Sequence, residues 1–274
     1  MKILANRAFY QSVLIFNAIL VLTPVFFLIN SSLRETSEFA RSPFGLARDP
    51  FWGNYSSVWS GGDFPTYLFN SLVITGGSLV LIVILSVGAG FVLARYQFRG
   101  SNLVLAFVLT GMLVPAKLAI LPLFIQLKWM GLLDSRIGLI LVYTSAALPA
   151  AIFIMSGFFK SLPSDLDNAA RVDGASEFTM LRKVMVPLVR PGMAIVGIYS
   201  AIPIWNDFFL PLVFLQSPEK KTLMQGLTVF FGQYASQWGV LFAGLCLAAL
   251  PLIVLYLVLS EQFIKGLTAG AVKG

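Results

Sequence analysis

The chain has 274 residues, 58% of them hydrophobic and only 11% charged, which excludes an ordinary soluble domain, where about half the residues are apolar and about a quarter charged. The net charge of +7 does not indicate nucleic-acid binding, because the basic residues lie between long apolar runs and form no basic face. The chain contains no histidine, which excludes Ser-His-Asp and Cys-His catalysis and argues strongly against a membrane-embedded enzyme.

Six apolar runs are long enough to cross the roughly 30 Å of membrane hydrocarbon as helices that rise about 1.5 Å per residue. They predict an all-α membrane protein with six transmembrane helices, at about 11–30, 68–94, 102–126, 137–159, 191–215 and 239–264. The first run is longer than a signal-peptide core and no clean cleavage site follows it, so we expect an uncleaved anchor.

The lysines and arginines set the expected orientation, because cytoplasmic loops carry the excess of these residues. With both termini inside, eleven of the 19 basic residues fall on the cytoplasmic side and seven on the outer side. Three of the outer seven share the longest outer loop with four carboxylates. The bias predicts cytoplasmic termini.

The inner loop at 160–190 has the most informative pattern. Ser164 with Asp167 three residues later approximates a capping box at the start of a short helix. The residues that share its apolar face, at i, i+3 and i+4, are Leu166, Ala169 and Ala170. We expect Gly174 to end this helix with a backbone angle φ that other residues rarely adopt.

A second amphipathic stretch follows in the same loop. Its apolar side is formed by Phe178, Leu181, Val184 and Met185. Pro187 is expected to stop it, since proline cannot continue a helix interior. Two short helices between two membrane helices predict a protruding knob suited to docking in a groove of a partner.

The motif Asn168-Ala169-Ala170-x-x-x-Gly174, nine residues, then Val184-x-Val186-Pro187 resembles the EAA loop of binding-protein-dependent ABC importer permeases. The family pattern is Glu-Ala-Ala-x-x-x-Gly-x9-Ile-x-Leu-Pro, so the chain departs from it at Asn168. Asp167 is adjacent and could partly substitute for the missing glutamate. The resemblance implies the type I importer permease fold and a loop that seats in a groove of an ATPase subunit.

On this resemblance, ten residues of the loop are expected to couple the chain to the ATPase. They are Asp167, Asn168, Ala169, Ala170, Arg171, Asp173, Gly174, Ala175, Phe178 and Pro187.

Further motifs resemble the smaller permease subunit of maltose-type sugar importers. They are Asn54-Tyr55, Asn70-Ser71, Ala94-Arg95-Tyr96-x-Phe98-x-Gly100, Gly131-Leu132-Leu133-Asp134 and Trp205-Asn206-Asp207-Phe208.

The C-terminal tail at 265–274 is similar to the tail of that carbohydrate branch, which reaches the interface of the two ATPase subunits. The tail residues expected to contact the ATPase are Thr268, Ala269, Gly270 and Lys273. A frayed glycine-rich end is the alternative interpretation.

No phosphate-binding Gly-x-x-x-x-Gly-Lys-Ser/Thr loop occurs, so the chain cannot hold ATP phosphates itself. We expect it to be no enzyme and to bind no cofactor or metal, with ATP and Mg²⁺ held by the ATPase. The resemblance implies a heterodimer with a second permease subunit, two ABC ATPase subunits and an extracytoplasmic solute-binding protein. The remaining partner is the lipid bilayer, and no nucleic acid is expected.

Polar residues inside apolar runs are the candidates for a substrate pathway, because they are costly unless they face the bundle or water. They are Trp205, Asn206, Asp207, Lys117 and Asn70. Tryptophan offers a stacking face to a sugar ring, and the amide and carboxylate offer hydrogen bonds. An interfacial aromatic anchor with a hydrogen bond inside the bundle is an equal alternative. Lys117 and Asp207 lie at similar depth, so an ion pair between them is a further hypothesis.

These observations predict a single transmembrane permease domain over 1–274, in the bacterial cytoplasmic membrane. The expected function is the import of a mono-, di- or oligosaccharide, driven by a separate ATPase through the loop at 160–190. The alternatives are import of a polyol or glycerol-3-phosphate by the same kind of system, and an ion-coupled secondary carrier. The carrier is disfavoured because no internal inverted repeat is evident.

Overall fold

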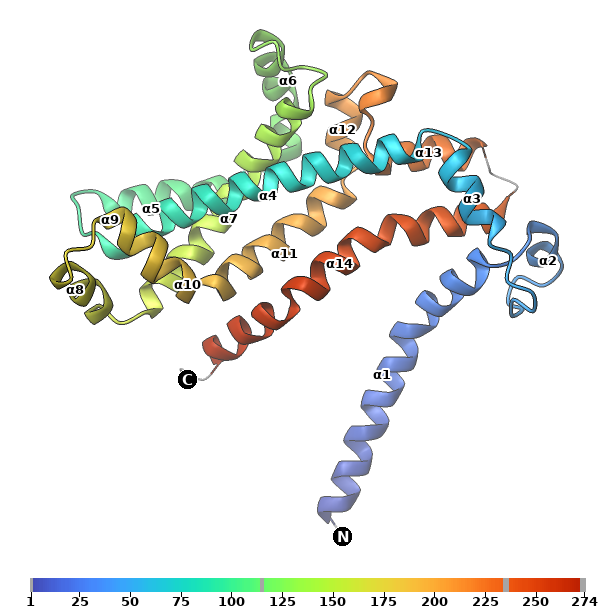
Figure 1. Cartoon of the computed structure of the whole chain (residues 1–274), viewed down its shortest axis with the longest axis horizontal. Coiled ribbons are helices and arrows are strands. Elements are labelled where there is room, and N and C mark those ends of the chain that lie inside the picture. Colours follow the sequence, from blue (N-terminus) through green and yellow to red (C-terminus); the bar gives the residue numbers. More distant parts are fainter. Residues whose placement is uncertain (1, 114–115, 234–236, 272–274) are drawn as a thin grey trace. The chain divides into compact units, whose positions relative to one another are not determined.

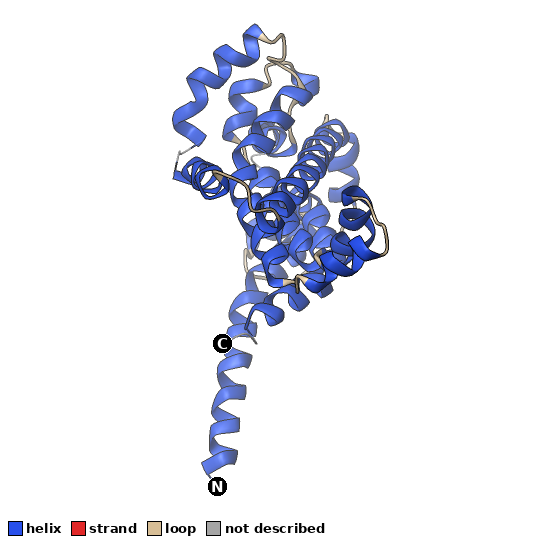
Figure 2. Cartoon of the chain, turned by 90° about the vertical axis from the view of Figure 1, so that its left-hand side faces the viewer, coloured by secondary structure: helices blue, strands red, loops and turns tan. Residues whose placement is uncertain are grey.

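The computed structural model describes residues 2–113, 116–233 and 237–271, and every regular element within them is a helix (Figures 1 and 2). The chain divides into two compact units. One consists of Met1–Pro65 with Gly226–Pro251, and the other of Thr66–Gln225 with Leu252–Gly274. The two units are described separately below.

The first unit begins with a long apolar helix. Its elements are α1 (Lys2–Ser32), α2 (Thr36–Arg41), α3 (Gly53–Ser60), most of α13 (Leu223–Gln233) and the first part of α14 (Trp238–Ala271). The apolar window of α1 buries none of its residues inside the chain. The junction after α1 is held by Asn54, whose amide donates to the carbonyls of Ser32 at 2.8 Å and Arg34 at 2.9 Å.

The second unit is a helical bundle. Its helices include α4 (Phe64–Arg95, which starts in the first unit), α5 (Ser101–Thr110), α6 (Ile120–Trp129), α7 (Arg136–Ser161), α11 (Arg190–Asn206), α12 (Phe209–Phe214) and the last part of α14. Among the residues described in this unit, 3₁₀ turns cover Gly111–Leu113, Ala116–Ala119 and Pro218–Lys220. Its core includes Ile82, Phe91, Met155 and Phe159. Helices α4 and α7 approach closely at Gly90, where an added Cβ would lie 2.8 Å from the Cβ of Met155.

The segment between α7 and α11 forms two helical pieces. They are α8 (Asp165–Val172) and a continuous stretch made of α9 (Glu177–Thr179), a π-helical turn (Met180–Met185) and α10 (Val186–Leu188). Figure 1 shows α8, α9 and α10 gathered at one end of α4 and α7. The predicted two-helix loop at 160–190 is therefore confirmed as local structure.

Four described helices are long and apolar enough to cross a membrane. They are Phe9–Ser32, Phe64–Arg95, Arg136–Ser161 and Trp238–Ile264. A fifth span results if the stretch Glu177–Leu188 and α11, which meet at a bend of 74°, are one broken span. The predicted helices at 11–30, 68–94, 137–159 and 239–264 are confirmed to within a few residues. Two of the six predicted spans, at 102–126 and 191–215, are not single helices.

The first correction concerns the run at 102–126, which forms two shorter helices, Ser101–Leu113 and Ile120–Trp129. Pro122 lies in the first turn of α6. A proline is tolerated there because the first N–H groups of a helix have no intrahelical partner, so the proline favours a new helix over a continuous one.

The second correction concerns the run at 191–215, which breaks between α11 and α12. Asp207 is extended, with φ −74° and ψ 126°, and one of its carboxylate oxygens accepts the N–H of Phe209 at 2.9 Å. This side chain offers the backbone an alternative to the helical hydrogen bond. Pro211 follows in the first turn of α12. The chain therefore restarts as a new helix.

Candidate coupling loop and pathway cavity

The segment at 160–190 is the candidate coupling loop, called the coupling loop below. Its first helix, α8, turns a different face inward from the one predicted. Asp167 and Ala170 are buried and Leu166 is half-buried, whereas Ala169 is exposed. The inward face is therefore centred on 166, 167 and 170. Asn168 lies on the exposed side, so its amide stands at a surface position where the family motif has a glutamate.

The start of α8 also differs from the prediction. Ser164 is helical and its side chain makes no capping hydrogen bond. The cap is at the next helix instead, where the Ser176 hydroxyl accepts the N–H of Thr179 at 3.3 Å. A serine before an acidic residue occurs at both positions, so the local pattern alone did not distinguish them.

Gly174 ends the α8 segment as predicted, with φ +75°. The N–H of Gly174 bonds the carbonyl of Arg171 at 3.0 Å, and the N–H of Ala175 bonds the carbonyl of Ala170 at 2.9 Å. These bonds satisfy carbonyls at the end of the helix, and the left-handed angle favours glycine. Asp173 is exposed at the C-cap. The sharp turn brings the two helices of the loop together.

The second helix of the loop exposes Phe178, which was expected on the apolar side with Leu181, Val184 and Met185. Met185 is fully buried, but Phe178 is 70% exposed. The π-helical turn has more residues per turn than an α-helix. The turn therefore rotates Val184 and Met185 away from the side of the helix on which Phe178 lies. Pro187 lies inside α10, which ends one residue later at Leu188.

Phe178 and Val172 are the two large apolar side chains most exposed on this loop, at 70% and 87%. Val172 was not among the predicted site residues. Exposed apolar side chains at the tip of a polar loop are typical of a docking surface. We call these two residues the apolar tip of the loop.

The tail residues can be placed only in part. Thr268, Ala269 and Gly270 belong to the last turns of α14, which continues to Ala271. Their side chains and all of Lys273 lie outside the described residues. Their contact with an ATPase stays a prediction.

A cavity of about 470 Å³ lies beside the break between α11 and α12. Its polar lining comes from Tyr143 on α7, Tyr199, Ser200 and Asn206 on α11, and Asp207 at the break. Asp207 accepts a hydrogen bond of 2.9 Å from the Tyr143 hydroxyl. The structure therefore brings two of the predicted pathway residues, Asn206 and Asp207, to one hollow, and adds two tyrosines that sequence reasoning missed.

The other three pathway candidates lie elsewhere. Trp205 is 3% exposed and is not among the residues lining the cavity. Lys117 belongs to the 3₁₀ turn Ala116–Ala119, and its side chain lies outside the described residues. Its ion pair with Asp207 stays a prediction. Asn70 is buried, and its amide donates to the carbonyls of Glu219 at 2.9 Å and Lys221 at 2.8 Å.

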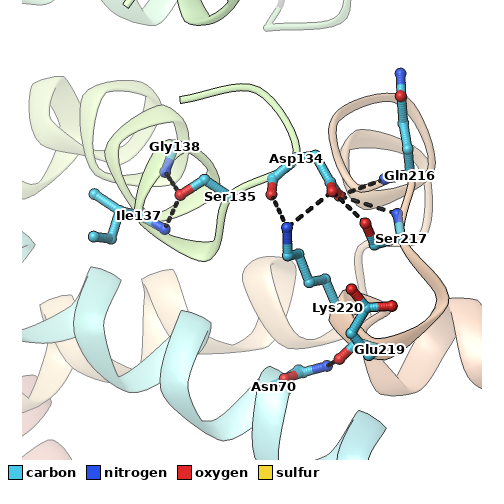
Figure 3. Close-up of polar contacts among 9 residues, drawn as sticks. All are labelled: Asn70, Asp134, Ser135, Ile137, Gly138, Gln216, Ser217, Glu219 and Lys220. Carbon is cyan, nitrogen blue, oxygen red and sulfur yellow. Dashed lines mark hydrogen bonds and ion pairs between the residues drawn. The ribbon is translucent and has the colours of Figure 1, made fainter. Parts of the chain in front are cut away.

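Asn70 belongs to a polar cluster near the starts of α4 and α7, and Figure 3 shows its contacts. The loop between α6 and α7 contributes Asp134, which has φ +53°, an angle that aspartate tolerates better than most residues. One Asp134 carboxylate oxygen accepts the N–H groups of Gln216 at 2.8 Å and Ser217 at 3.0 Å. The other accepts the Ser217 hydroxyl and, at 2.9 Å, the ammonium of Lys220.

This cluster, which we call the loop clamp, joins three segments that are distant in sequence: the loop before α7, the loop after α12, and α4. Partial burial acts to raise the pKa of the Asp134 carboxyl. The hydrogen bonds from Ser217, Lys220 and Gln216 outweigh this effect and hold the pKa well below its ordinary value. The charged form of Asp134 therefore stabilises the clamp.

We expect Asp134→Asn to lower the free energy of unfolding by about 1 to 2 kcal/mol, because it removes the charge that Lys220 pairs with. A depressed pKa contributes stability above the ordinary carboxyl pKa of about 4, and this contribution is lost only as the pH falls below that value. The deficit should therefore be equal at pH 7.5 and pH 5, measured by thermal denaturation in detergent. Glu219→Gln, which neutralises an exposed carboxylate in the same loop, is the control. A deficit that shrinks at pH 5 would contradict the depressed pKa.

Comparison with known proteins identifies the family. The family model described as "Binding-protein-dependent transport system inner membrane component" matches residues 86–266. The chain is 35% identical over 265 residues to the diacetylchitobiose uptake system permease protein NgcG of Streptomyces coelicolor, covering 96% of this chain and 88% of the relative. It is 36% identical over 261 residues to the arabinooligosaccharides transport system permease protein AraQ of Bacillus subtilis, covering 94% and 92%.

Two further comparisons cover nearly the whole chain. The trehalose transport system permease protein SugB of Mycobacterium tuberculosis is 34% identical over 275 residues, covering 98% of this chain and 99% of the relative. The crystal structure of a bacterial ABC transporter involved in the import of the acidic polysaccharide alginate contains a chain with a TM-score of 0.81 and 26% identity. That match covers 94% of this chain and 98% of the other.

The resemblance that began with the loop motif is therefore confirmed, and the prediction that the chain is no enzyme is confirmed with it, since family members are transport components and are not catalytic themselves. Binding-protein-dependent transport implies partnership with an ATPase and with a binding protein. The chain is a multi-pass inner-membrane protein that belongs to the family of binding-protein-dependent transport system inner membrane components, the permease subunits of ABC importers.

Proposed function

We propose that this permease subunit imports a mono-, di- or oligosaccharide across the bacterial cytoplasmic membrane, with the coupling loop and both termini in the cytoplasm. The observation that carries the coupling role is the apolar tip, Val172 and Phe178, exposed on a loop whose other large apolar side chains, apart from Leu188, are buried or half-buried. Phe178 is one of the ten predicted coupling residues, and Val172 lies in sequence between two others, Arg171 and Asp173. The sugar assignment is supported by the relatives named for diacetylchitobiose, arabinooligosaccharides and trehalose.

The cavity beside Asp207 is our candidate for part of the substrate pathway. Its lining combines two tyrosines with an amide and a carboxylate. Aromatic rings pack against the apolar faces of sugar rings, while the polar groups can hydrogen bond to hydroxyls. The pathway proposal therefore rests on Asn206 and Asp207, with Tyr143 and Tyr199 added, and not on the buried Trp205.

The charge of the cavity lining distinguishes between the alternative solutes, a polyol and glycerol-3-phosphate. The lining residues that the structure describes include one carboxylate and no basic side chain. A carboxylate repels a phosphate ester, so this lining favours a neutral sugar or polyol over glycerol-3-phosphate. The family assignment removes the ion-coupled secondary carrier, because members of this family work with a binding protein and an ATPase.

The partner set follows from the same proposal. One chain supplies half of a central pathway, and we propose a heterodimer with a second permease subunit, together with two ATPase subunits and an extracytoplasmic binding protein. The apolar window of α1, which buries none of its residues inside the chain, leaves a helix surface for the second permease subunit or for lipid.

The test is uptake into proteoliposomes that contain the chain with its cognate permease and ATPase subunits. A panel of neutral oligosaccharides, a polyol and glycerol-3-phosphate is presented with the solute-binding protein, with and without ATP inside. We expect uptake of a neutral sugar that depends on both ATP and the binding protein. Uptake driven by an ion gradient without ATP, or uptake of glycerol-3-phosphate alone, would contradict the proposal.

A further inference from the structure

The coupling loop is held by the end of a helix that is distant from it in sequence. Arg95 is the last residue of α4. Its guanidinium donates to the carbonyls of Leu162 at 3.1 Å and Pro163 at 3.4 Å, which lie between α7 and α8. Its Nε lies 3.4 Å from a carboxylate oxygen of Asp167 in the first turn of α8. One side chain therefore spans the entry to the coupling loop.

The ion pair is largely shielded from water. The side chains of Arg95 and Asp167 are 9% and 13% exposed. The second carboxylate oxygen of Asp167 is buried and makes no hydrogen bond to any residue that the structure describes. A buried carboxylate in this state depends on its cation, and removing one partner of such a pair is far more costly than losing a surface ion pair.

The next residue of the chain holds the second helix of the loop. The Tyr96 hydroxyl donates to Glu177, the first residue of α9. The other carboxylate oxygen of Glu177 lies 3.4 Å from the guanidinium of Arg171, in the last turn of α8. The ring of Tyr96 lies edge-on against Phe91 of α4, with centroids 5.7 Å apart. Two adjacent residues thus contact both helices of the loop.

We propose that Arg95 and Tyr96 form a clasp that makes α4 move with the coupling loop. This inference rests on the proposed function, in which the loop receives movement from the ATPase. Helices α7 and α11 flank the loop and are joined to it by the chain. By contrast, Arg95 is separated from its partner Leu162 by 67 positions in sequence, so α4 depends on side-chain contacts to follow the loop. Arg95 and Tyr96 are positioning residues in this scheme.

The clasp changes the role expected of Asp167 and Arg171. Asp167 does not stand in for the family glutamate on the docking face, because its carboxylate faces α4. Arg171 and Glu177 brace the angle between the two helices of the loop. The close approach at Gly90 packs α4 against α7 near the end of α4 that carries Arg95. Movement transmitted through the clasp therefore acts on a helix that already packs against α7.

The experiment measures solute uptake per ATP hydrolysed in proteoliposomes that contain the complete complex and its binding protein. Arg95→Gln is expected to keep ATPase association and hydrolysis but to lower this ratio about tenfold, as the loss of a charge-assisted contact predicts. The charge reversal Arg95→Asp with Asp167→Arg should recover part of the ratio. Arg99→Gln, which removes the same charge from an exposed side chain four residues later, should leave the ratio unchanged.

A purely structural role would lower yield, hydrolysis and uptake together and leave the ratio at its wild-type value, and that result would overturn the clasp. If the Arg95→Gln variant fails to assemble, Tyr96→Phe is the decisive variant, because it removes only a hydroxyl. A lowered uptake per ATP hydrolysed in this variant supports the clasp, and a wild-type value overturns it. Failure of the wild-type chain to associate with an ATPase would instead refute the proposed function itself.

Discussion

A permease that carries Val172→Asp and Phe178→Asp is expected to lose its ATPase subunits during purification in mild detergent. Both side chains are exposed, so the substitutions leave the packing of the loop intact. A docking site that receives an apolar tip would have to desolvate two new carboxylates, which are unpaired there. Central apolar contacts dominate interface energies, so we expect the affinity to fall about 100-fold. The measurement is the amount of ATPase recovered with the tagged permease.

The matched control is Phe44→Asp, which places the same charge at an aromatic residue that is 88% exposed in the loop between α2 and α3. That loop is predicted to lie on the other side of the membrane, so ATPase recovery should not change. Equal loss of ATPase from both variants would indicate general destabilisation. Full recovery from the double variant would show that the apolar tip does not contact the ATPase.

The second large effect is expected at Asp207. The carboxylate has a structural role and a candidate pathway role, and Asp207→Ala and Asp207→Asn separate the two. It accepts the N–H of Phe209 at the start of α12, and it lines the cavity while accepting from Tyr143. Asp207→Ala removes both roles, and the lost backbone contact alone should cost about 1 kcal/mol of stability. Asp207→Asn keeps an oxygen for Phe209 but removes the charge.

If the cavity belongs to the pathway, uptake should fall about tenfold or more in both Asp207 variants, while the yield of assembled Asp207→Asn complex stays normal. Tyr143→Phe should also reduce uptake, because it frees the carboxylate from its partner. Tyr256→Phe removes a hydroxyl from a half-exposed tyrosine of α14 and is the control. Normal uptake by assembled Asp207→Asn would leave Asp207 with only a structural role.

The loop clamp and the clasp lie at opposite ends of the bundle and are held by different types of contact. The clamp holds loop backbone to Asp134 and Asn70 through many short hydrogen bonds. The clasp depends on one buried ion pair and one tyrosine hydroxyl. Asp134→Asn should therefore affect stability alone, whereas Arg95→Gln should lower the uptake per ATP hydrolysed in addition to any loss of stability.

Local sequence was sufficient for features that depend on neighbouring residues. The long helices α1, α4, α7 and α14 follow from apolar runs, because a membrane span needs only length and hydrophobicity. The turn at Gly174 follows from glycine being the residue best suited to a positive φ. The EAA-like spacing in the loop was enough to indicate the family, since it preserves the geometry of two short helices.

The features that the sequence left undetermined depend on residues far apart in the chain. Asp167 faces inward because it pairs with Arg95, and Asp207 lines the cavity where it accepts a hydrogen bond from Tyr143. Periodicity within one helix reveals neither of these long-range partners. The exposure of Phe178 required a π-helical turn, which shifts the helical phase on which the pattern was read. The amino-acid sequence by itself determined the membrane class, the main helices and the two-helix loop at 160–190. Only the tertiary structure decided which faces are buried, because burial of a charge depends on the partner that folding brings to it.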